Sequence, residues 1–511
     1  MAPCDLCSMK RRLALMSTLA LVFVGVAQPS FAGPAAAVGE LASLSLQPAG
    51  QFIRIWDDRG TGADGDVSVW RPHVGLYPGY HSLGDIVMKG YGAPSNTFLV
   101  RDEADFLARP TGYRWIWDDK GSGGDYDGSL WEPIPPMGYI CLGSVANSGY
   151  YPPSTDVVRC LKSTYTLPGV AGKEWDDSGS GADDDVSLWQ SDPADYRGLS
   201  TSTFVARQGH SDSGGAQRYR VINKTLTREP ALSGSPVTTA TARAFAPRVW
   251  MHPGESYFPS SVEFHLSNVH ESKGYLVTNQ ALGCDSCTDP AFLDGVRPNS
   301  AAVSTYAEVV HRTDNGVPTN VTDIVYWMFY PYNDGKRVCI GLMSPSGCIG
   351  GFSTFGNHVG DWEHVTIRFV GGLPTKVYYS QHADGQEFTF GDKRIRLTGW
   401  RPDVYSAKGS HGSYPGTGVH VYRGLPNGDQ LKDETGSGVL WDTASALVAF
   451  TWQPRGTYTG PLAWLNITSR WGNPKSGCAI SEPVSGQCVL NDGPEGPMLR
   501  DYSQPPLKPM E

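Results

Sequence analysis

The chain has 511 residues, 18% of them charged, and a formal net charge of −10 at pH 7. This acidic balance, without a basic cluster in the body of the chain, argues against nucleic acid as a partner and against simple electrostatic docking on anionic lipid. The 61 Gly, 38 Pro and 11% aromatic residues indicate many turns and few long helices, so we expect a mainly β fold.

The first 32 residues have the pattern of a secretory signal. Three basic residues at positions 10–12 precede an apolar stretch over 13–27, and Ser30-Phe31-Ala32 has the small-x-small form of a cleavage site. The apolar stretch is too short for a membrane anchor. We therefore expect residues 1–32 to be removed and the remaining chain to be secreted.

A fifteen-residue string then occurs three times, starting at Trp56, Trp117 and Trp175. The copies are WDDRGTGADGDVSVW, WDDKGSGGDYDGSLW and WDDSGSGADDDVSLW. Repeats about 60 residues apart indicate one supersecondary unit built three times with pseudo-threefold symmetry. The Gly residues of each string supply the positive φ angles of a tight loop between two Trp-bearing strands. We expect a three-repeat β domain over residues 45–225, either β-prism-like or a looser array.

Each string carries four aspartates at fixed offsets, which are candidate cation ligands. They are Asp57, Asp58, Asp64 and Asp66, then Asp118, Asp119, Asp125 and Asp127, and finally Asp176, Asp177, Asp183 and Asp185. Oxygen-rich loops suit Ca²⁺, although the spacing does not match an EF-hand. The alternative is that these side chains form Asx turns and accept hydrogen bonds from amides of their own loop.

Eight cysteines remain after the signal segment, and they fall in close pairs. The pairs are Cys141 with Cys160, Cys284 with Cys287, Cys339 with Cys348, and Cys478 with Cys488. Close pairs in a secreted chain predict four local disulfides formed in an oxidising compartment. Zinc is the alternative for Cys284 and Cys287, but after the signal segment no second CxxC motif or nearby His pair supports it.

A segment rich in Ser, Thr and Ala over residues 226–243 has no core-forming period and is the predicted linker. Beyond it, residues 244–500 contain segments rich in β-branched and aromatic residues, among them 323–330, 361–370 and 446–452. They predict a β-sandwich-like second domain.

The sharpest chemical signal in this second domain is the string FGNHVGDWEHVTIRF. If a strand begins at Asp361, period-two alternation places Asp361 and Glu363 on one face. His358 lies three residues upstream in a Gly-containing loop and can fold over the same face. Such a set suits Mg²⁺, Ca²⁺ or Mn²⁺. The alternative is a surface strand whose acids form ion pairs with Arg368 or nearby Lys residues.

Five further motifs occur in a fixed order in the second half of the chain. They are HPGESYFPSS, WMFYPYNDGK, GNHVGDWEHV, VYYSQHADG and VYSAKGSHGSYP, which start at residues 252, 327, 356, 377 and 404. Together with the Trp strings, they make the chain similar to the vacuolar protein sorting-associated protein 62-like family. The family name implies a sorting role, which a secreted protein need not share.

The string HVGDWEH also resembles the signature GHRHDWE of the necrosis- and ethylene-inducing-like proteins. These are secreted cytolysins that bind a divalent cation and engage sphingolipid headgroups. The resemblance implies a cation site at His358, Asp361 and Glu363, with Asp334 as the counterpart of an upstream acidic ligand. Gly360 stands where the signature has its second His, and this departure bears on cytolytic activity more than on the metal site.

Two functions are compatible with these features. The first is a secreted recognition or membrane-active protein that binds a glycan or a lipid headgroup with a divalent cation, Ca²⁺ or Mg²⁺, through peripheral membrane contact. The second is a metal-dependent hydrolase of phosphodiesters or glycosides. In the second, the loop residues His382 or His411 would act as general acid or base, whereas in the first they are candidate ligand-binding residues. We favour recognition, because neither resemblance supplies a catalytic base.

Overall fold

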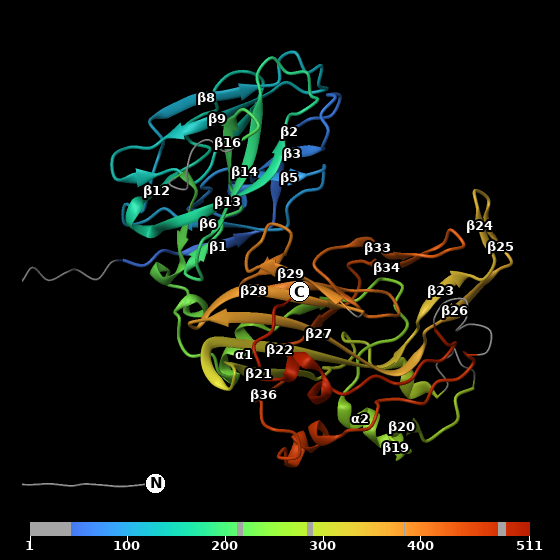
Figure 1. Ribbon diagram of the computed structural model, residues 1–511. Coiled ribbons are helices and arrows are strands. Elements are labelled where there is room, and N and C mark those ends of the chain that lie inside the picture. Colours follow the sequence, from blue (N-terminus) through green and yellow to red (C-terminus); the bar gives the residue numbers. More distant parts are fainter. Residues whose placement is uncertain (1–41, 212–217, 284–289, 383, 479–486, 511) are drawn as a thin grey trace, which may run out of the picture. The chain divides into compact units, whose positions relative to one another are not determined.

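The computed structural model describes residues 42–211, 218–283, 290–382, 384–478 and 487–510, which belong to one compact unit. Strands dominate, as the composition predicts, and the α-helices of these ranges are short, α1 (Thr239–Phe245) and α2 (Val262–Ser267) (Figure 1). The predicted signal segment and the predicted pair of Cys284 and Cys287 lie outside the described residues. No helix within the described ranges is long and apolar enough to span a membrane.

The first two predicted repeats each form a three-stranded antiparallel sheet, and the third forms three antiparallel strands of a five-stranded sheet. The strands are β2 (Phe52–Asp57), β3 (Val67–Pro72) and β5 (Ile86–Lys89), then β8 (Gly112–Asp118), β9 (Gly128–Ile134) and β11 (Val145–Ser148), and finally β13 (Thr166–Asp176), β14 (Val186–Pro193) and β16 (Phe204–Gln208). In all three sheets the register shifts just before the first Trp of the string. The bulge therefore recurs with the sequence.

Shorter strands complete the repeats. They are β1 (Leu46–Ala49), β4 (Tyr80–His81) and β6 (Thr97–Arg101) in one sheet, β7 (Leu107–Ala108), β10 (Tyr139–Ile140) and β12 (Cys160–Lys162) in another, and β15 (Gly198–Leu199) and β17 (Arg220–Asn223) with the first part of β13. The first two repeats thus contribute two three-stranded sheets each, whereas the third contributes one five-stranded sheet.

The first Trp of each string is buried at the centre of the repeats. The ring of Trp56 lies 5.5 Å from that of Trp117 and 6.2 Å from that of Trp175, edge to face in both cases. Each indole N–H donates to a backbone carbonyl at the tenth position of another repeat's string. The acceptors, in the order of the donors, are Tyr126, Asp184 and Gly65, at 3.1, 2.6 and 2.5 Å. Each string is therefore hydrogen-bonded to the next in a closed cycle of three repeats. The prism arrangement remains a prediction.

The largest sheet follows the repeats in the chain and has six strands, in the order β29-β28-β27-β22-β21-β36. Their bounds are β21 (Thr305–Asp314), β22 (Val317–Asn333), β27 (His358–Val370), β28 (Leu373–Gln381), β29 (Asp384–Thr389) and β36 (Leu447–Thr451). The predicted strands 323–330, 361–370 and 446–452 fall in β22, β27 and β36.

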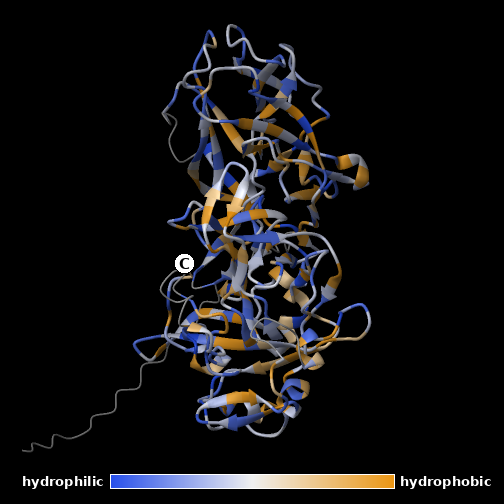
Figure 2. Ribbon diagram, turned by 90° about the vertical axis from the view of Figure 1, so that its right-hand side faces the viewer, coloured by the Kyte–Doolittle hydropathy of each residue, from blue (hydrophilic) through white to orange (hydrophobic). Residues whose placement is uncertain are grey.

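Strand β22 sends alternate side chains into two separate cores. Tyr326, Met328 and Tyr330 join one hydrophobic cluster, whereas the residues between them join the other. The first cluster also contains residues of a second sheet, whose strands are β18 (Arg248–Trp250), β30 (Leu397–Thr398), β31 (Arg401–Ser406), β32 (Ser413–Tyr414) and β35 (Leu440–Asp442). Two sheets therefore enclose one core, and hydrophobic and hydrophilic residues alternate along many strands (Figure 2).

The predicted linker, residues 226–243, ends inside α1. Ala242 and Phe245 of this helix are buried in the first cluster, which also includes Leu46 and Phe98 from the first repeat. Residues from both sides of the linker thus share one core. The boundaries 45–225 and 244–500 remain predictions.

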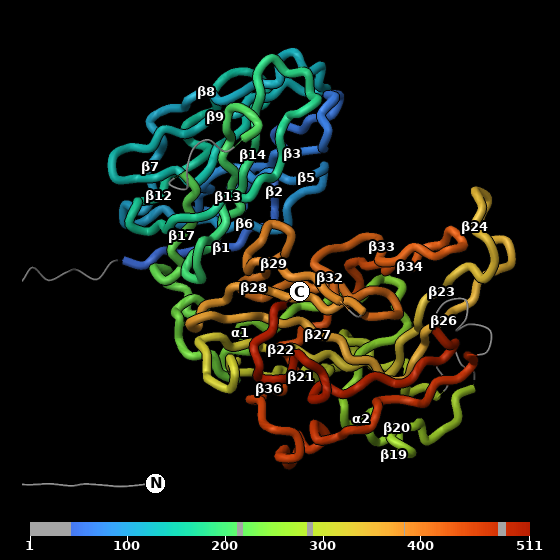
Figure 3. The backbone as a smooth tube through the Cα atoms, in the orientation of Figure 1, coloured from blue at the N-terminus to red at the C-terminus, as the bar shows by residue number. Residues whose placement is uncertain are grey.

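Two-stranded ribbons complete the described chain (Figure 3). They are β19 (Val269–Ser272) with β20 (Tyr275–Thr278), β23 (Lys336–Cys339) with β26 (Phe352–Phe355), β24 (Leu342–Ser344) with β25 (Gly347–Ile349), and β33 (Gly418–Gly424) with β34 (Gln430–Thr435). Three of the predicted disulfides are present among the described residues, namely Cys141–Cys160, Cys339–Cys348 and Cys478–Cys488.

Candidate functional site

Asp361 and Glu363 lie on the same face of β27, as period-two alternation predicts. Strand β27 is paired on both sides, with β22 and β28, and its two acids are only 5% and 9% exposed. They are therefore interior residues and not the acids of a surface strand. The arginine expected to pair with them in that alternative, Arg368, instead pairs with Asp323.

Asp361 forms a buried ion pair with His411. Its Oδ2 atom accepts a hydrogen bond from the Asn333 side chain at 2.9 Å and lies 2.9 Å from Nδ1 of His411. Burial alone would lower the pKa of His411, but the hydrogen bond to Asp361 and the charge of Glu255 outweigh burial and raise it. Burial alone would raise the pKa of Asp361, but the hydrogen bond to His411 together with the charges of His358 and His411 lowers it.

Both ring nitrogens of His411 are engaged. Nε2 lies 3.0 Å from the carbonyl oxygen of Tyr257, which can only accept a hydrogen bond. The imidazole also stacks on Tyr330, with ring centroids 3.8 Å apart and planes 4° from parallel. A ring that donates from both nitrogens is an imidazolium. His411 therefore has no free nitrogen for a cation or for proton transfer unless this network opens.

Glu363 and His358 occupy environments that favour their neutral forms. Burial and the charge of Asp361 raise the pKa of Glu363 well above its usual value, and its Oε2 atom accepts from the Ser380 hydroxyl at 2.5 Å. Burial lowers the pKa of His358, whose Nδ1 lies 2.6 Å from the carbonyl oxygen of Gly360. Glu363 is therefore a poorer cation ligand than the sequence suggests, whereas the neutral imidazole is the form in which His358 can bind a metal.

Gly360 has a physical reason for departing from the cytolysin signature. Its φ is +71°, and an added Cβ would lie 1.7 Å from the carbonyl oxygen of Trp471. The backbone at this position approaches the segment around Trp471 too closely for a side chain. The second His of the signature cannot be accommodated here.

Asp334, the remaining predicted ligand, lines a pocket of about 240 Å³ together with Lys336, Arg337 and Lys408. Burial and the nearby charge of Glu255 raise the pKa of Asp334 to about 6. The pocket thus combines a weakly acidic carboxyl with several cations.

Asp433 is a functional candidate that the sequence does not reveal, because it lies in the unremarkable string LKDET. It is fully buried and accepts hydrogen bonds from the hydroxyls of Ser410 and Tyr414, both at 2.7 Å, and it pairs with Lys336. Burial alone would raise the pKa of Asp433, but its hydrogen bond to His382, at 2.7 Å, and the charge of Lys336 hold it well below the usual range. The predicted ligand-binding residue His382 is therefore already committed to an internal partner.

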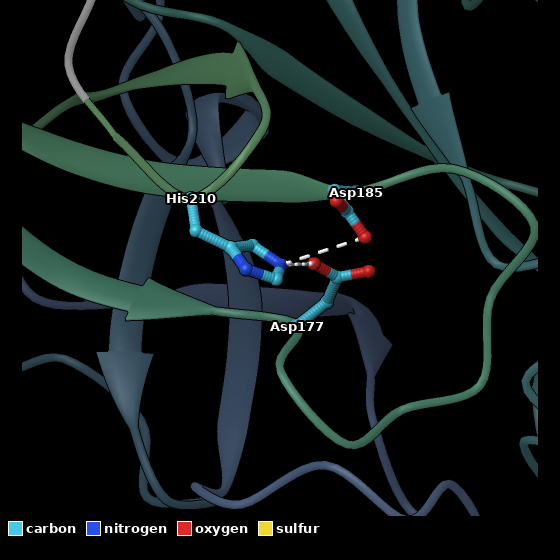
Figure 4. Close-up of side chains that lie close together, drawn as sticks. All are labelled: Asp177, Asp185 and His210. Carbon is cyan, nitrogen blue, oxygen red and sulfur yellow. Dashed lines mark hydrogen bonds and ion pairs between the residues drawn. The ribbon is translucent and has the colours of Figure 1, made fainter.

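One group of His, Cys, Asp or Glu residues within the described ranges brings three ligand atoms within 4.8 Å of one another, and it lies in the third repeat. It consists of Asp177, Asp185 and His210 (Figure 4). Nε2 of His210 lies 2.8 Å from Oδ1 of Asp177 and 3.7 Å from Oδ1 of Asp185. The Asp177 side chain is buried, whereas those of Asp185 and His210 are 68% and 39% exposed. The group is thus open to solvent on one side.

The first two repeats carry tyrosine where the third carries His210. Each of these residues follows a Gly whose N–H donates at 2.8 Å to the eleventh residue of the string, namely Asp66, Asp127 or Asp185. The hydroxyls of Tyr91 and Tyr150 donate to the side chains of Asp66 and Asp127, at 3.1 and 3.0 Å. A phenol therefore closes the first two loops, and an imidazole occupies its place in the third. His210 lies outside the repeated string, which is why the sequence comparison of the strings overlooks it.

The side chains of the first two aspartates of each string accept hydrogen bonds from amides of their own loop, as the Asx alternative describes. The first aspartate of each string accepts from the amide two residues ahead; these are Asp57, Asp118 and Asp176, at 3.2, 3.4 and 3.1 Å. The second accepts from the amide nine residues ahead; these are Asp58, Asp119 and Asp177, at 3.0, 3.0 and 2.8 Å. The third donates its own amide to a carbonyl of another repeat; these are Asp64, Asp125 and Asp183. Backbone amides therefore neutralise much of the loop charge.

A family model described as vacuolar protein sorting-associated protein 62 matches residues 17–278 and 304–482, and the chain belongs to this family. Two Saccharomyces cerevisiae proteins are similar to it. Vacuolar protein sorting-associated protein 62 is 29% identical over 36% of this chain and 41% of its own length. The putative vacuolar protein sorting-associated protein TDA6 is 26% identical over 35% of this chain and 41% of its own length. The matches thus span less than half of these relatives.

Two solved structures also show similarity. The crystal structure of GNIP1Aa from Chromobacterium piscinae is 26% identical over 37% of this chain and 38% of that chain, with a TM-score of 0.33. A structure described as a toxin fold for microbial attack and plant defense is 19% identical over 42% of this chain and 76% of that chain, with a TM-score of 0.21.

Proposed function

We propose that the chain is a secreted recognition protein whose third repeat holds a divalent cation and, through it, an oxygen-rich ligand. The observation that carries this proposal is the replacement of the loop-closing tyrosine by His210 beside Asp177 and Asp185. Three local disulfides support an oxidising compartment, in agreement with the predicted signal.

The ligand set favours a borderline metal over the Ca²⁺ or Mg²⁺ expected from the sequence. One imidazole and two carboxylates suit Zn²⁺ or Mn²⁺, whereas Ca²⁺ prefers six to eight oxygen atoms. Three protein ligands leave at least one coordination position open to an external group. A carboxylate or vicinal hydroxyls of a glycan, or the phosphate of a lipid headgroup, would complete the coordination.

The hydrolase alternative has weaker support from the geometry. Its proposed acid or base, His411, donates from both nitrogens, and His382 is paired with Asp433. A general acid or base needs a proton position within reach of substrate. We therefore retain recognition as the function that the geometry supports best.

The test is calorimetric titration of Zn²⁺, Mn²⁺ and Ca²⁺ into the metal-stripped chain without residues 1–32. We expect one saturable site, lost in His210→Tyr, because this substitution installs the residue that the other two repeats use. The reciprocal variant Tyr150→His should raise the stoichiometry to two. Equal binding by the native chain and His210→Tyr would refute the site.

The source of the external ligand is then separated in two arms. Glycan arrays and phosphatidylcholine vesicles are each tested with the metal and with EDTA. Binding that requires the metal in one arm identifies the ligand class. Binding that is the same with metal and with EDTA in both arms would contradict a bridging cation.

A further inference from the structure

The segment over residues 336–355, called the stapled ribbon below, forms a narrow arm built from β23, β24, β25 and β26. Strand β23 pairs with β26, strand β24 pairs with β25, and a disulfide joins Cys339 to Cys348. In Figures 1 and 3, β24 and β25 lie at the far end of this arm. The stapled ribbon thus projects from the sheets that precede and follow it in the chain.

The loop between β33 and β34 holds the stapled ribbon in a defined position. The Asn427 side chain donates to the carbonyl oxygens of Cys339 and Gly341, at 2.7 and 2.9 Å. The N–H of Cys339 donates to Asp429 at 2.7 Å, and the N–H of Met343 donates to the Asn427 carbonyl at 3.0 Å. Four hydrogen bonds and a disulfide make the arm an ordered element.

The stapled ribbon exposes four large apolar side chains, called the apolar tip. Ile340, Leu342, Ile349 and Phe352 are 50%, 60%, 62% and 43% exposed. Single exposed apolar residues are common on proteins, but four on one twenty-residue arm are a concentration that points to an interaction surface. Because the tip is a projection and not a groove, its occupant must be able to surround it.

The charge of the stapled ribbon identifies that occupant. Residues 336–355 contain Lys336 and Arg337 but no Asp or Glu, in a chain whose net charge is −10. Arg337 lies over the Phe352 ring, 4.4 Å from its centroid, and also lines the 240 Å³ pocket with Lys408. Among the described residues, neither Arg337 nor Lys408 has an ion pair, and the pocket lining as a whole holds four cationic side chains against the carboxyls of Asp334 and Glu434. A cationic pocket therefore adjoins the apolar tip.

We propose that the stapled ribbon docks on a phospholipid surface, with the apolar tip in the membrane interface and a headgroup phosphate in the pocket. Aliphatic and Phe side chains bury their apolar area among acyl chains, while Arg and Lys remain at the level of the phosphates. The docking is local, so it is compatible with the net negative charge that argues against attraction of the whole chain. It goes beyond the proposed function and does not depend on the cation in the third repeat.

The experiment is flotation of the full chain without residues 1–32 on vesicles, with EDTA throughout so that metal-dependent recognition does not contribute. One set of vesicles is phosphatidylcholine, and the other adds phosphatidylserine at about one part in four. We expect binding to both, stronger on the second. The double variant Leu342→Ser, Ile349→Ser should lower binding about tenfold or more, because it removes apolar contact area. Arg337→Gln with Lys408→Gln should abolish the preference for phosphatidylserine.

The matched control is Val317→Ser, which removes an apolar side chain that is 65% exposed at the first residue of β22. It should bind vesicles as the native chain does. Unchanged binding of the Leu342→Ser, Ile349→Ser variant, or absence of native binding to both vesicles, overturns the proposal. Sedimentation velocity on the same proteins tests whether a second copy of the chain occupies the tip. A native dimer that the double variant abolishes would assign the tip to a second copy and would also overturn the proposal.

Discussion

A buried histidine makes the stability of this protein sensitive to acid. His265 lies on α2 with no exposed surface, and its ring packs edge to face on Phe329, with centroids 4.7 Å apart. Neither ring nitrogen has a hydrogen-bond partner among the described residues. Burial lowers the pKa of His265 to about 3. The folded chain therefore keeps this imidazole neutral at pH values above about 3.

The sign of the pH effect follows from the difference between the two states. The unfolded histidine has a pKa of about 6.5, so below that pH the unfolded chain binds a proton that the folded chain does not. The stability that the neutral imidazole allows is complete above pH 6.5 and is lost as the pH falls toward 3. A pH of 5 lies about 1.5 units below the pKa of the unfolded histidine, and each unit is worth about 1.4 kcal/mol. Proton binding therefore stabilises the unfolded state by about 2 kcal/mol at pH 5.

The assay is urea unfolding followed by tryptophan fluorescence, at pH 8 and pH 5, for the native chain and His265→Phe. Phe keeps an aromatic ring beside Phe329 and Trp471 and removes the titrating group. We expect His265→Phe to lose about 2 kcal/mol less free energy of unfolding between the two pH values than the native chain loses. Equal losses in the two proteins would refute the buried, neutral state of His265.

Two further predictions concern packing and charge. Gly128 takes the place of a valine found in the other two strings, because an added Cβ would lie 2.1 Å from the Trp56 side chain. Gly128→Val should therefore lower the free energy of unfolding by about 1–3 kcal/mol. An unchanged melting temperature would contradict the packing of the three Trp residues. Asp323 is fully buried between Arg312 and Arg368, at 2.6 and 2.8 Å. Asp323→Asn should lower the free energy of unfolding, measured by chemical denaturation, by about 3–5 kcal/mol. A loss below about 1 kcal/mol would show that these ion pairs are not buried in solution.

The repeats and the central strands could be predicted because their signals are local. Each string contains its own turn residues and the two Trp residues of the flanking strands. The alternation in β22 and β27 is likewise visible within a few residues. The site could not be predicted in the same way. Asp361 meets His411 across 50 residues of sequence, and Asp433 meets His382 across 51. Alternation indicates which side chains share a face, but it does not indicate whether that face is covered by another sheet.

The same limitation explains why the sequence does not distinguish the buried acidic group around Asp361 from the open one in the third repeat. On β27, the oxygens of Asp361 and Glu363 already accept hydrogen bonds from Asn333 and Ser380, and His411 supplies the compensating positive charge. A cation there would have to displace an imidazolium and break satisfied buried bonds, which is costly. In the third repeat, Asp185 is exposed and its contact with His210, at 3.7 Å, is longer than a hydrogen bond. A cation there would take the place of the 2.8 Å contact between His210 and Asp177 and would gain the exposed carboxylate of Asp185, which is the basis of the proposed site.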